Sequence, residues 1–374
     1  MSSEDKKLNV VLCANSSWYI YNFRKNTIKA FTEEGHQVFV VAPRDEYSKH
    51  FAGLGAEHYD FNLDPRGTNP FKEVMVIRAL LFIYLRVMPN FVMNFTPKMN
   101  IYSTVASFFV GAKVVNNISG LGAVFIENTL FSKFVCLLYR VTQIFAIKVF
   151  FQNQYDMERF VGRKIVPQHK CEYLPGSGVD LERFVVTEAA DDGVVRFIIV
   201  CRMLYEKGVG LLVEAAEYCQ AKYGDRVEFR AVGFLDDKNQ GAVSEEVMND
   251  WVTNGFLIYQ GALEDVRPEI AISDCMVLPS VYPEGTPKSL LEAAAMGKPI
   301  ITNNMPGCSS VVEHGVNGLL CRPNSIDDLI ISLERLIDMG HDARLEMGVK
   351  SRELVERKFD ERIVIEKYLD CLGL

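Results

Sequence analysis

The chain has 374 residues, of which 49% are hydrophobic and 24% charged, and its formal net charge is −8. This composition excludes a disordered protein, and the length favours two α/β domains over one. The N-terminus is unlike a secretory signal, no uncharged apolar run of 18 residues predicts a spanning helix, and nine scattered cysteines without a C-x-x-C pair argue against a zinc or disulfide framework.

Short apolar runs alternate with helical periods along the chain, which predicts βαβ units around parallel sheets. In the first half the predicted strands are Leu8–Ala14, Gln37–Pro43, Asn90–Phe95, Ala112–Ile118 and Lys148–Asn153. In the second half they are Arg196–Arg202, Val227–Gly233, Phe256–Ala262, Cys275–Ser280 and Pro299–Asn303. Because the pattern restarts after a polar stretch, we predict domains at 1–183 and 184–352, with a C-terminal helix in 353–374 that crosses back to the first domain. The predicted fold is α/β, with two Rossmann-like domains facing across a cleft.

The first half of the chain is basic and rich in phenylalanine. Residues 1–182 hold 20 Lys and Arg against 16 Asp and Glu, together with 18 of the 24 phenylalanines. Within this half, Val74–Met88 and Leu130–Phe151 are apolar segments with scattered cations. Each is interpreted either as an interfacial helix on an anionic membrane surface or as a core helix with basic ends. The charge and phenylalanine bias favours membrane contact, whereas no Lys/Arg-rich run supports nucleic-acid binding.

The segment Pro283–Pro299, PEGTPKSLLEAAAMGKP, follows directly after a predicted strand. Thr286 is a suitable N-cap, Pro287 suits the first helical position, and Gly297 ends the helix. A helix that starts where a strand ends is a ready anion site, suited to a pyrophosphate.

Two glutamates flank this helix start. Glu284 precedes it and Glu292 follows it by six residues, so the two carboxylates can reach different parts of one nucleotide-sugar. The alternative is that Glu292 pairs with Lys288 one turn earlier on an exposed helix face.

This E-x7-E segment, followed by PGCSSVVEHGVNGLL, resembles the C-terminal signature of glycosyltransferase family 4, whose members are retaining enzymes of the GT-B fold. The resemblance extends over nearly the whole chain, through NSSWYIYNFR, SGLG, FQNQYD, PGSGVD and CRMLYEKG. Within the family the chain is most similar to bacterial transferases that extend undecaprenyl-diphosphate-linked sugars. The resemblance implies transfer of a sugar, an N-acetylhexosamine such as N-acetylgalactosamine, from a UDP-sugar to a polyprenyl-diphosphate-linked acceptor. It places the enzyme in O-antigen, capsule or glycoprotein synthesis, on the inner face of the cytoplasmic membrane.

The resemblance also implies roles for individual residues. Arg202 and Lys207 match the diphosphate clamp, which stabilises the negative charge of the leaving group. Glu284 matches the contact to the donor-sugar hydroxyls, and Glu292 matches the contact to the ribose hydroxyls. We therefore expect Arg202, Lys207 and Glu284 to be catalytic. The further residues expected to bind the nucleotide-sugar are Ser16, Ser17, Gly285, Thr286, Pro287, Lys288 and Ser289.

The chain departs from the family at Ser119. Many members have a histidine before the corresponding glycine loop, but this chain reads NNISGLG and its six histidines lie elsewhere. A histidine base in this loop is therefore excluded, and retention would rely on the departing phosphate oxygen to accept the acceptor's proton. Asn117, Ser119 and Gly120 are expected either to orient the donor or acceptor or only to shape the wall of the cleft. Arg24 is expected either to face the cleft or to be an ordinary surface arginine.

Neither a metal nor another cofactor is expected, because the adjacent acid pairs lack a D-x-D context and the clamp cations and helix dipole oppose the diphosphate charge. Three other functions remain open. A transferase with another UDP-sugar donor would share the site. A GT-B nucleotide-sugar epimerase would place titratable groups at the sugar and have no lipid-facing surface. A non-catalytic scaffold would keep the fold without the chemistry.

Overall fold

The computed structural model describes residues 7–64, 67, 69–120, 129–236 and 239–373. The chain divides into two compact units. Unit 1 comprises Met1–Ser177 and Arg362–Leu374, and unit 2 comprises Gly178–Glu361. The predicted boundary at 183/184 therefore lies six residues late. The predicted return at 353 lies nine residues early, because helix α12 (His341–Lys358) runs on within unit 2.

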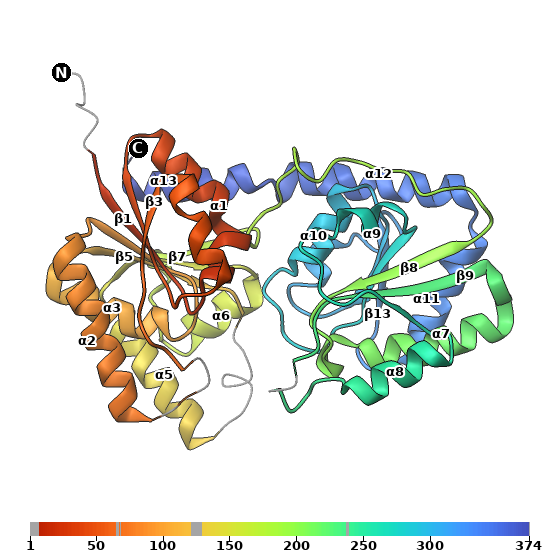
Figure 1. Cartoon of the computed structure of the whole chain (residues 1–374), viewed down its shortest axis with the longest axis horizontal. Coiled ribbons are helices and arrows are strands. Elements are labelled where there is room, and N and C mark those ends of the chain that lie inside the picture. The colour runs from red at the N-terminus through yellow and green to blue at the C-terminus, as the bar shows by residue number, and fades with distance from the viewer. Residues whose placement is uncertain (1–6, 65–66, 68, 121–128, 237–238, 374) are drawn as a thin grey trace. The chain divides into compact units, whose positions relative to one another are not determined.

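Unit 1 is built on a seven-stranded sheet of order β3-β2-β1-β4-β5-β6-β7, with all neighbouring strands parallel (Figure 1). The strands are β1 (Asn9–Cys13), β2 (Gln37–Val41), β3 (Ala56–Tyr59), β4 (Phe91–Asn94), β5 (Lys113–Ile118), β6 (Ala146–Phe151) and β7 (Cys171–Tyr173). Because side chains alternate along each strand, the sheet buries apolar residues on both faces. Val10 and Leu12 face one core, while Val11 and Cys13 face another.

Helices cover both faces of this sheet. Helices α1 (Ser17–Glu33) and α13 (Glu361–Leu372) share the core on one face, through residues such as Ile28 and Tyr368. The other face carries α2 (Pro70–Val87), α3 (Met99–Val110), α5 (Leu130–Thr142) and α6 (Gln154–Gly162). The segment Leu130–Phe151 is thus not one helix: α5 ends at Thr142, and the rest enters the sheet as β6. Over the described residues, no helix is long and apolar enough to cross a membrane.

Unit 2 contains a six-stranded parallel sheet of order β10-β9-β8-β11-β12-β13. Its strands are β8 (Val195–Val200), β9 (Val227–Val232), β10 (Ile258–Tyr259), β11 (Cys275–Leu278), β12 (Ile300–Asn303) and β13 (Gly318–Cys321). Its other helices are α7 (Val209–Tyr223), α8 (Glu245–Thr253), α9 (Arg267–Ala271), α10 (Lys288–Ala295) and α11 (Ile326–Asp338). The chain builds this sheet outward from β8 in one direction and from β11 in the other. The carboxyl ends of β8 and β11 therefore form a topological switch point, where open α/β sheets bind ligands.

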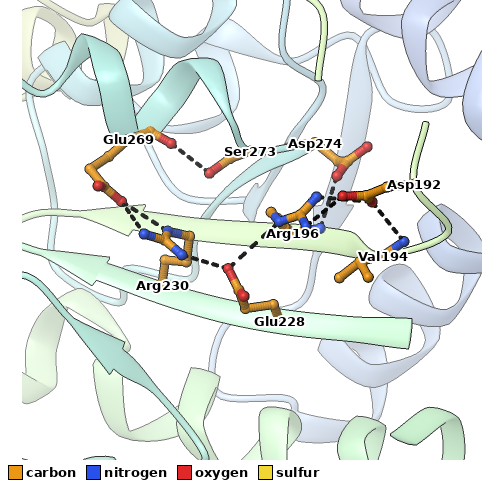
Figure 2. A network of polar contacts seen from close by, with 8 residues as sticks. All are labelled: Asp192, Val194, Arg196, Glu228, Arg230, Glu269, Ser273 and Asp274. Atoms are coloured by element: carbon orange, nitrogen blue, oxygen red, sulfur yellow. Dashed lines mark hydrogen bonds and ion pairs between the residues drawn. The ribbon is translucent and has the colours of Figure 1, made fainter. Parts of the chain in front are cut away.

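A polar network ties together the opposite, amino-terminal ends of these strands (Figure 2). Arg196 at the start of β8 pairs with Asp192 at 2.7 Å, and its backbone amide donates to Asp274, which precedes β11. Arg230 on β9 pairs with Glu228 at 2.6 Å and with Glu269 of α9 at 2.7 Å. Both arginines are thus held by carboxylates. The two arginines beside a pocket of about 520 Å³, which Arg196 and Glu228 help to line, are therefore already neutralised.

Candidate active site

The loops that follow β8 and β11 bring the predicted clamp and carboxylate residues of unit 2 together. Lys207 lies in the loop after β8 and forms an ion pair with Glu284 in the loop after β11. The two loops are also tied through Glu206, whose carbonyl accepts the Val281 amide at 3.0 Å. Ser280 Oγ lies 3.2 Å from both the Glu206 carbonyl and Glu284 Oε1. Two predicted catalytic residues 77 positions apart therefore share one rigid corner at the switch point.

Glycines allow these loops to approach so closely. Gly208, at φ +81°, would place a Cβ 2.3 Å from the Pro279 carbonyl oxygen. Gly307, at φ +85°, would place a Cβ 1.6 Å from the Gly285 carbonyl oxygen. A side chain at either position would both strain the backbone and push the neighbouring loop away. The signature glycines thus set the distance between the site's loops.

Arg202, the other predicted clamp cation, is held differently from Lys207. Its guanidinium lies 3.6 Å from Asp236, in the loop after β9, and its side chain is 45% exposed. The Lys207 side chain is only 13% exposed. In this conformation each cation therefore faces a carboxylate, and Lys207 lies in the less hydrated surroundings.

Helix α10 (Lys288–Ala295) begins one residue later than the sequence suggests. Its N-cap is Pro287, without a side-chain cap hydrogen bond, so the predicted N-cap role of Thr286 is wrong. A proline at the cap fixes an extended entry, and the first helical residues are Lys288 and Ser289. Gly297, at φ +74°, ends the helix as predicted. The positive end of the α10 dipole thus begins four residues after Glu284 in the chain.

Glu292 lies in the second turn of α10. Its carboxylate is 3.8 Å from the Lys288 ammonium, and the two side chains are 13% and 24% exposed. The expected alternative of a Lys288–Glu292 pair is therefore present, although on a largely covered rather than an exposed face. Gly285 and Thr286 are buried, while Pro287 and Ser289 are half-buried. All these residues lie on the same loop-and-helix segment as Glu284.

The predicted donor contacts of unit 1 lie at the start of α1. Ser16 is the N-cap and accepts from the Tyr19 amide at 3.2 Å. Ser17 is fully buried; its hydroxyl donates to the Pro43 carbonyl and accepts from the Ser48 hydroxyl, each at 2.9 Å. The Ser17 hydroxyl therefore serves the fold, and the expected contact of Ser16 and Ser17 with the sugar donor, through their backbone amides or hydroxyls, stays a prediction.

One predicted site residue near the end of β5 has a clear structural task. Asn117 is buried, donates to the Asn94 carbonyl at 3.0 Å and accepts from the Tyr368 hydroxyl at 2.6 Å. It therefore anchors α13 to the sheet, which argues against a role in orienting substrate. Ser119 and Gly120 follow as half-buried residues, with Gly120 at φ +137°. The remaining SGLG residues, Leu121 and Gly122, lie outside the described residues.

Arg24 is not a surface arginine. It is 1% exposed, and its guanidinium lies 4.9 Å from the centre of the Phe95 ring and 5.7 Å from that of Tyr368. Its Nη1 donates to the carbonyls of Phe23 and Ser177, while Nε and Nη2 have no hydrogen-bond partner among the described residues. Aromatic faces and backbone oxygens thus stabilise this buried charge.

Comparisons with known proteins identify the chemistry that this arrangement serves. Residues 195–339, which hold the corner at β8 and β11, match the family model "Glycosyl transferases group 1". The chain is a glycosyltransferase with the GT-B fold. It is 26% identical to the N,N'-diacetylbacillosaminyl-diphospho-undecaprenol alpha-1,3-N-acetylgalactosaminyltransferase of Campylobacter jejuni, over 94% of each chain. It is 28% identical to the UDP-Gal:alpha-D-GlcNAc-diphosphoundecaprenol alpha-1,3-galactosyltransferase of Escherichia coli, over 73% of each.

Solved structures support the same fold for this glycosyltransferase. Anabaena HepE in complex with UDP and glucose superposes with a TM-score of 0.81 at 16% identity, covering 98% of this chain and 99% of that one. A glycosyltransferase from Rickettsia africae superposes with a TM-score of 0.75 at 17% identity, covering 98% of each. The predicted two-domain α/β architecture is thereby confirmed.

The structure adds residues to the glycosyltransferase site that sequence reasoning missed. Asp236 contacts Arg202 from a different loop. Ser280 contacts Glu284 from the same loop but belongs to no recognisable motif. The position of Ser280 directly after β11 was the available hint. Cys308 also lies near the Lys207–Glu284 pair, but burial raises the pKa of its thiol to about 12. It is thus an inert core residue.

No three His, Cys, Asp or Glu side chains in the described part of the chain come close enough to hold a metal ion together. The adjacent acid pairs of the sequence are Asp191–Asp192, Asp236–Asp237 and Asp327–Asp328. Of these, Asp328 pairs with Arg322 at 2.7 Å, and Asp192 pairs with Arg196. Asp237 lies outside the described residues. Metal-independent activity stays a prediction.

Proposed function

We propose that this glycosyltransferase moves a sugar from a uridine diphosphate sugar to an undecaprenyl-diphosphate-linked saccharide in bacterial surface-glycan or glycoprotein synthesis. The observation that carries the proposal is the corner at the switch point, where Lys207 pairs with Glu284, with Arg202 in the same loop after β8 and the start of α10 four residues after Glu284 in the chain. This set suits a nucleoside diphosphate on one side and sugar hydroxyls on the other. The Campylobacter and Escherichia relatives, whose names specify undecaprenyl-linked acceptors, support the lipid-linked acceptor.

In the proposed reaction the bond between the anomeric carbon and the diphosphate oxygen breaks, and a bond to the acceptor hydroxyl oxygen forms on the same face. The acceptor's proton passes to the departing phosphate oxygen, so no protein base is required. Lys207 and Arg202 stabilise the charge that develops on that diphosphate. For this, Lys207 must exchange its contact with Glu284 for one with phosphate, which leaves the Glu284 carboxylate to accept from the donor-sugar hydroxyls. Glu292 binds the ribose diol.

We further propose an N-acetylhexosamine, such as N-acetylgalactosamine, as the transferred sugar, and a peripheral location on the inner face of the cytoplasmic membrane. The acceptor's lipid tail stays in the bilayer while its sugar reaches the enzyme. The names of the two relatives specify different sugars, N-acetylgalactosamine and galactose. The donor must therefore be identified by experiment.

The test is a donor screen with purified protein, radiolabelled UDP-sugars and a short-chain polyprenyl-diphosphate sugar as acceptor. Transfer of label to lipid, with retained anomeric configuration in the product, is expected. Interconversion of UDP-sugars without transfer would instead identify an epimerase. Failure of every donor to react in either way would identify a scaffold.

A further inference from the structure

Two helices of unit 1 present rows of large apolar side chains to solvent. On α2 the row includes Phe71, Met75, Phe82 and Leu85, of which Phe71 is 85% exposed and Phe82 65%. Intervals of four, seven and three residues, each close to a whole number of helical turns, place them on one line, about 21 Å long at roughly 1.5 Å per residue. The buried face of α2 is separately filled by other apolar residues that pack on the sheet. The core therefore does not account for this second apolar face.

Helix α5 repeats the same pattern. Leu130, Phe134, Leu137 and Val141 are each at least half exposed and follow the same spacing, and Ile144 continues the row beyond the helix. A single exposed leucine is ordinary, but rows this long on one unit indicate an interaction surface.

Helix α3 joins the two rows into one surface. It contacts both α2 and α5, and the three helices lie together on one side of the unit 1 sheet (Figure 1). At its end Phe108 and Phe109 are 52% and 66% exposed. The Phe108 ring lies 4.4 Å from that of Phe145, in the turn after α5. We call the exposed side chains of α2, the end of α3, and α5 with its following turn the apolar surface.

Cations without acidic partners are distributed over this surface. Residues 74–155 contain seven Lys and Arg but a single acidic residue. Two of these cations, Lys98 and Lys148, pair with carboxylates outside this range. Arg78 is exposed on α2, and Lys133 and Arg140 are exposed on α5. Within the described residues, no carboxylate forms an ion pair with any of these three. Arg140 instead donates to the backbone carbonyls of residues 163 and 164, at 2.7 and 3.1 Å, so its charge is not neutralised.

We propose that the apolar surface docks onto an anionic lipid bilayer. Cations of one sign set among phenylalanine and leucine match an interfacial helix, whose apolar side chains enter the acyl boundary while Lys and Arg meet the headgroups. The core of a protein–protein interface is instead depleted in charge, and Lys is scarce there. Docking would hold unit 1 at the membrane that carries the acceptor, and this last purpose rests on the proposed function.

The binding test uses the full chain and vesicles of neutral phosphatidylcholine, with or without a third of phosphatidylglycerol. The protein should sediment with the anionic vesicles, less so as salt rises. Since each cation contributes about fivefold to partitioning, Lys133→Glu with Arg140→Glu should lower it by about 25-fold or more. Phe134→Ser with Leu137→Ser should lower it by at least tenfold. The matched controls lie on α11 of unit 2 and are Ile331→Ser, at a 62% exposed site, and Arg335→Glu, at an exposed site. Each control should change vesicle partitioning less than twofold.

Transfer assays separate this proposal from the proposed function. The α5 variants should keep wild-type transfer to a short, water-soluble acceptor, which also shows that they fold, while transfer to a long-chain acceptor in vesicles falls. Vesicle binding by a protein that transfers no sugar would support docking and refute the proposed function. Equal vesicle binding by the α5 variants and the α11 controls would refute docking. So would an absence of vesicle binding together with a concentration-dependent oligomer that the α5 changes dissociate.

Discussion

Replacement of Lys207 by alanine should reduce turnover far more than it reduces stability. The ammonium lies at the switch point beside Glu284, and the Lys207 side chain is 13% exposed. Two unit charges 4 Å apart attract by roughly 1 kcal/mol in bulk water and by about 4 kcal/mol at an effective dielectric constant of 20. Lys207 lies nearer the second limit, because it is mostly covered. Removing one preorganised group that stabilises developing negative charge typically costs ~10²–10³ in kcat, and we expect the upper end.

Arg202→Ala provides the internal comparison. The Arg202 side chain is 45% exposed and lies 3.6 Å from Asp236, so solvent weakens its field at the phosphate. We expect a loss of about 10², smaller than for Lys207. Lys222, whose ion pair with Glu334 at 2.6 Å lies on the surface of the same unit, is the matched control, and Lys222→Ala should alter kcat less than twofold.

The assay is kcat at saturating donor and acceptor, with thermal unfolding measured on each variant. Because Lys207→Ala also deprives Glu284 of its ion pair, the double variant Lys207→Ala/Glu284→Gln completes a cycle that separates the two effects. Near-wild-type turnover in Lys207→Ala, or a larger loss in Arg202→Ala, would refute the reasoning.

Three further outcomes are expected. Calorimetry with bare UDP should show weaker binding by Glu292→Gln than by wild type. Glu284→Gln should bind UDP at least as well as wild type, because Lys207 is released, but it should use the UDP-sugar poorly. The opposite pattern would mean that the two roles are reversed. Activity should survive excess EDTA and gain little from added Mg²⁺ or Mn²⁺, and a metal-reversible loss would reveal an ion site. Burial lowers the pKa of Lys298 from its ordinary value of 10.5 to about 8. Between these two pH values the unfolded state binds the proton more tightly than the folded state, so the free energy of unfolding rises with pH. Lys298→Met should therefore be the more stable protein at pH 7, by up to about 3 kcal/mol, and denaturant titrations should show this gain shrinking towards pH 10.5; a gain that does not change with pH would contradict the assignment.

The sequence alone determined the fold class and most of the central strands. Parallel strands are buried on both faces, so β1, β8 and β11 are nearly continuous apolar runs that can be recognised without neighbours. The strands that were missed, β3, β7 and β13, are all at a sheet edge or short. An edge strand has one partner, and its sequence carries a correspondingly weak signal.

Only the tertiary structure decided which residues meet at the site. The E-x7-E segment was visible because its residues are near one another in the chain. The pairing of Lys207 with Glu284 and of Arg202 with Asp236 depends on which strand ends lie side by side, and local periodicity does not encode strand order. Burial likewise reassigned Ser17 and Arg24: α1 turns the same face towards the sheet at both positions, so side chains expected near substrate or solvent became part of the core.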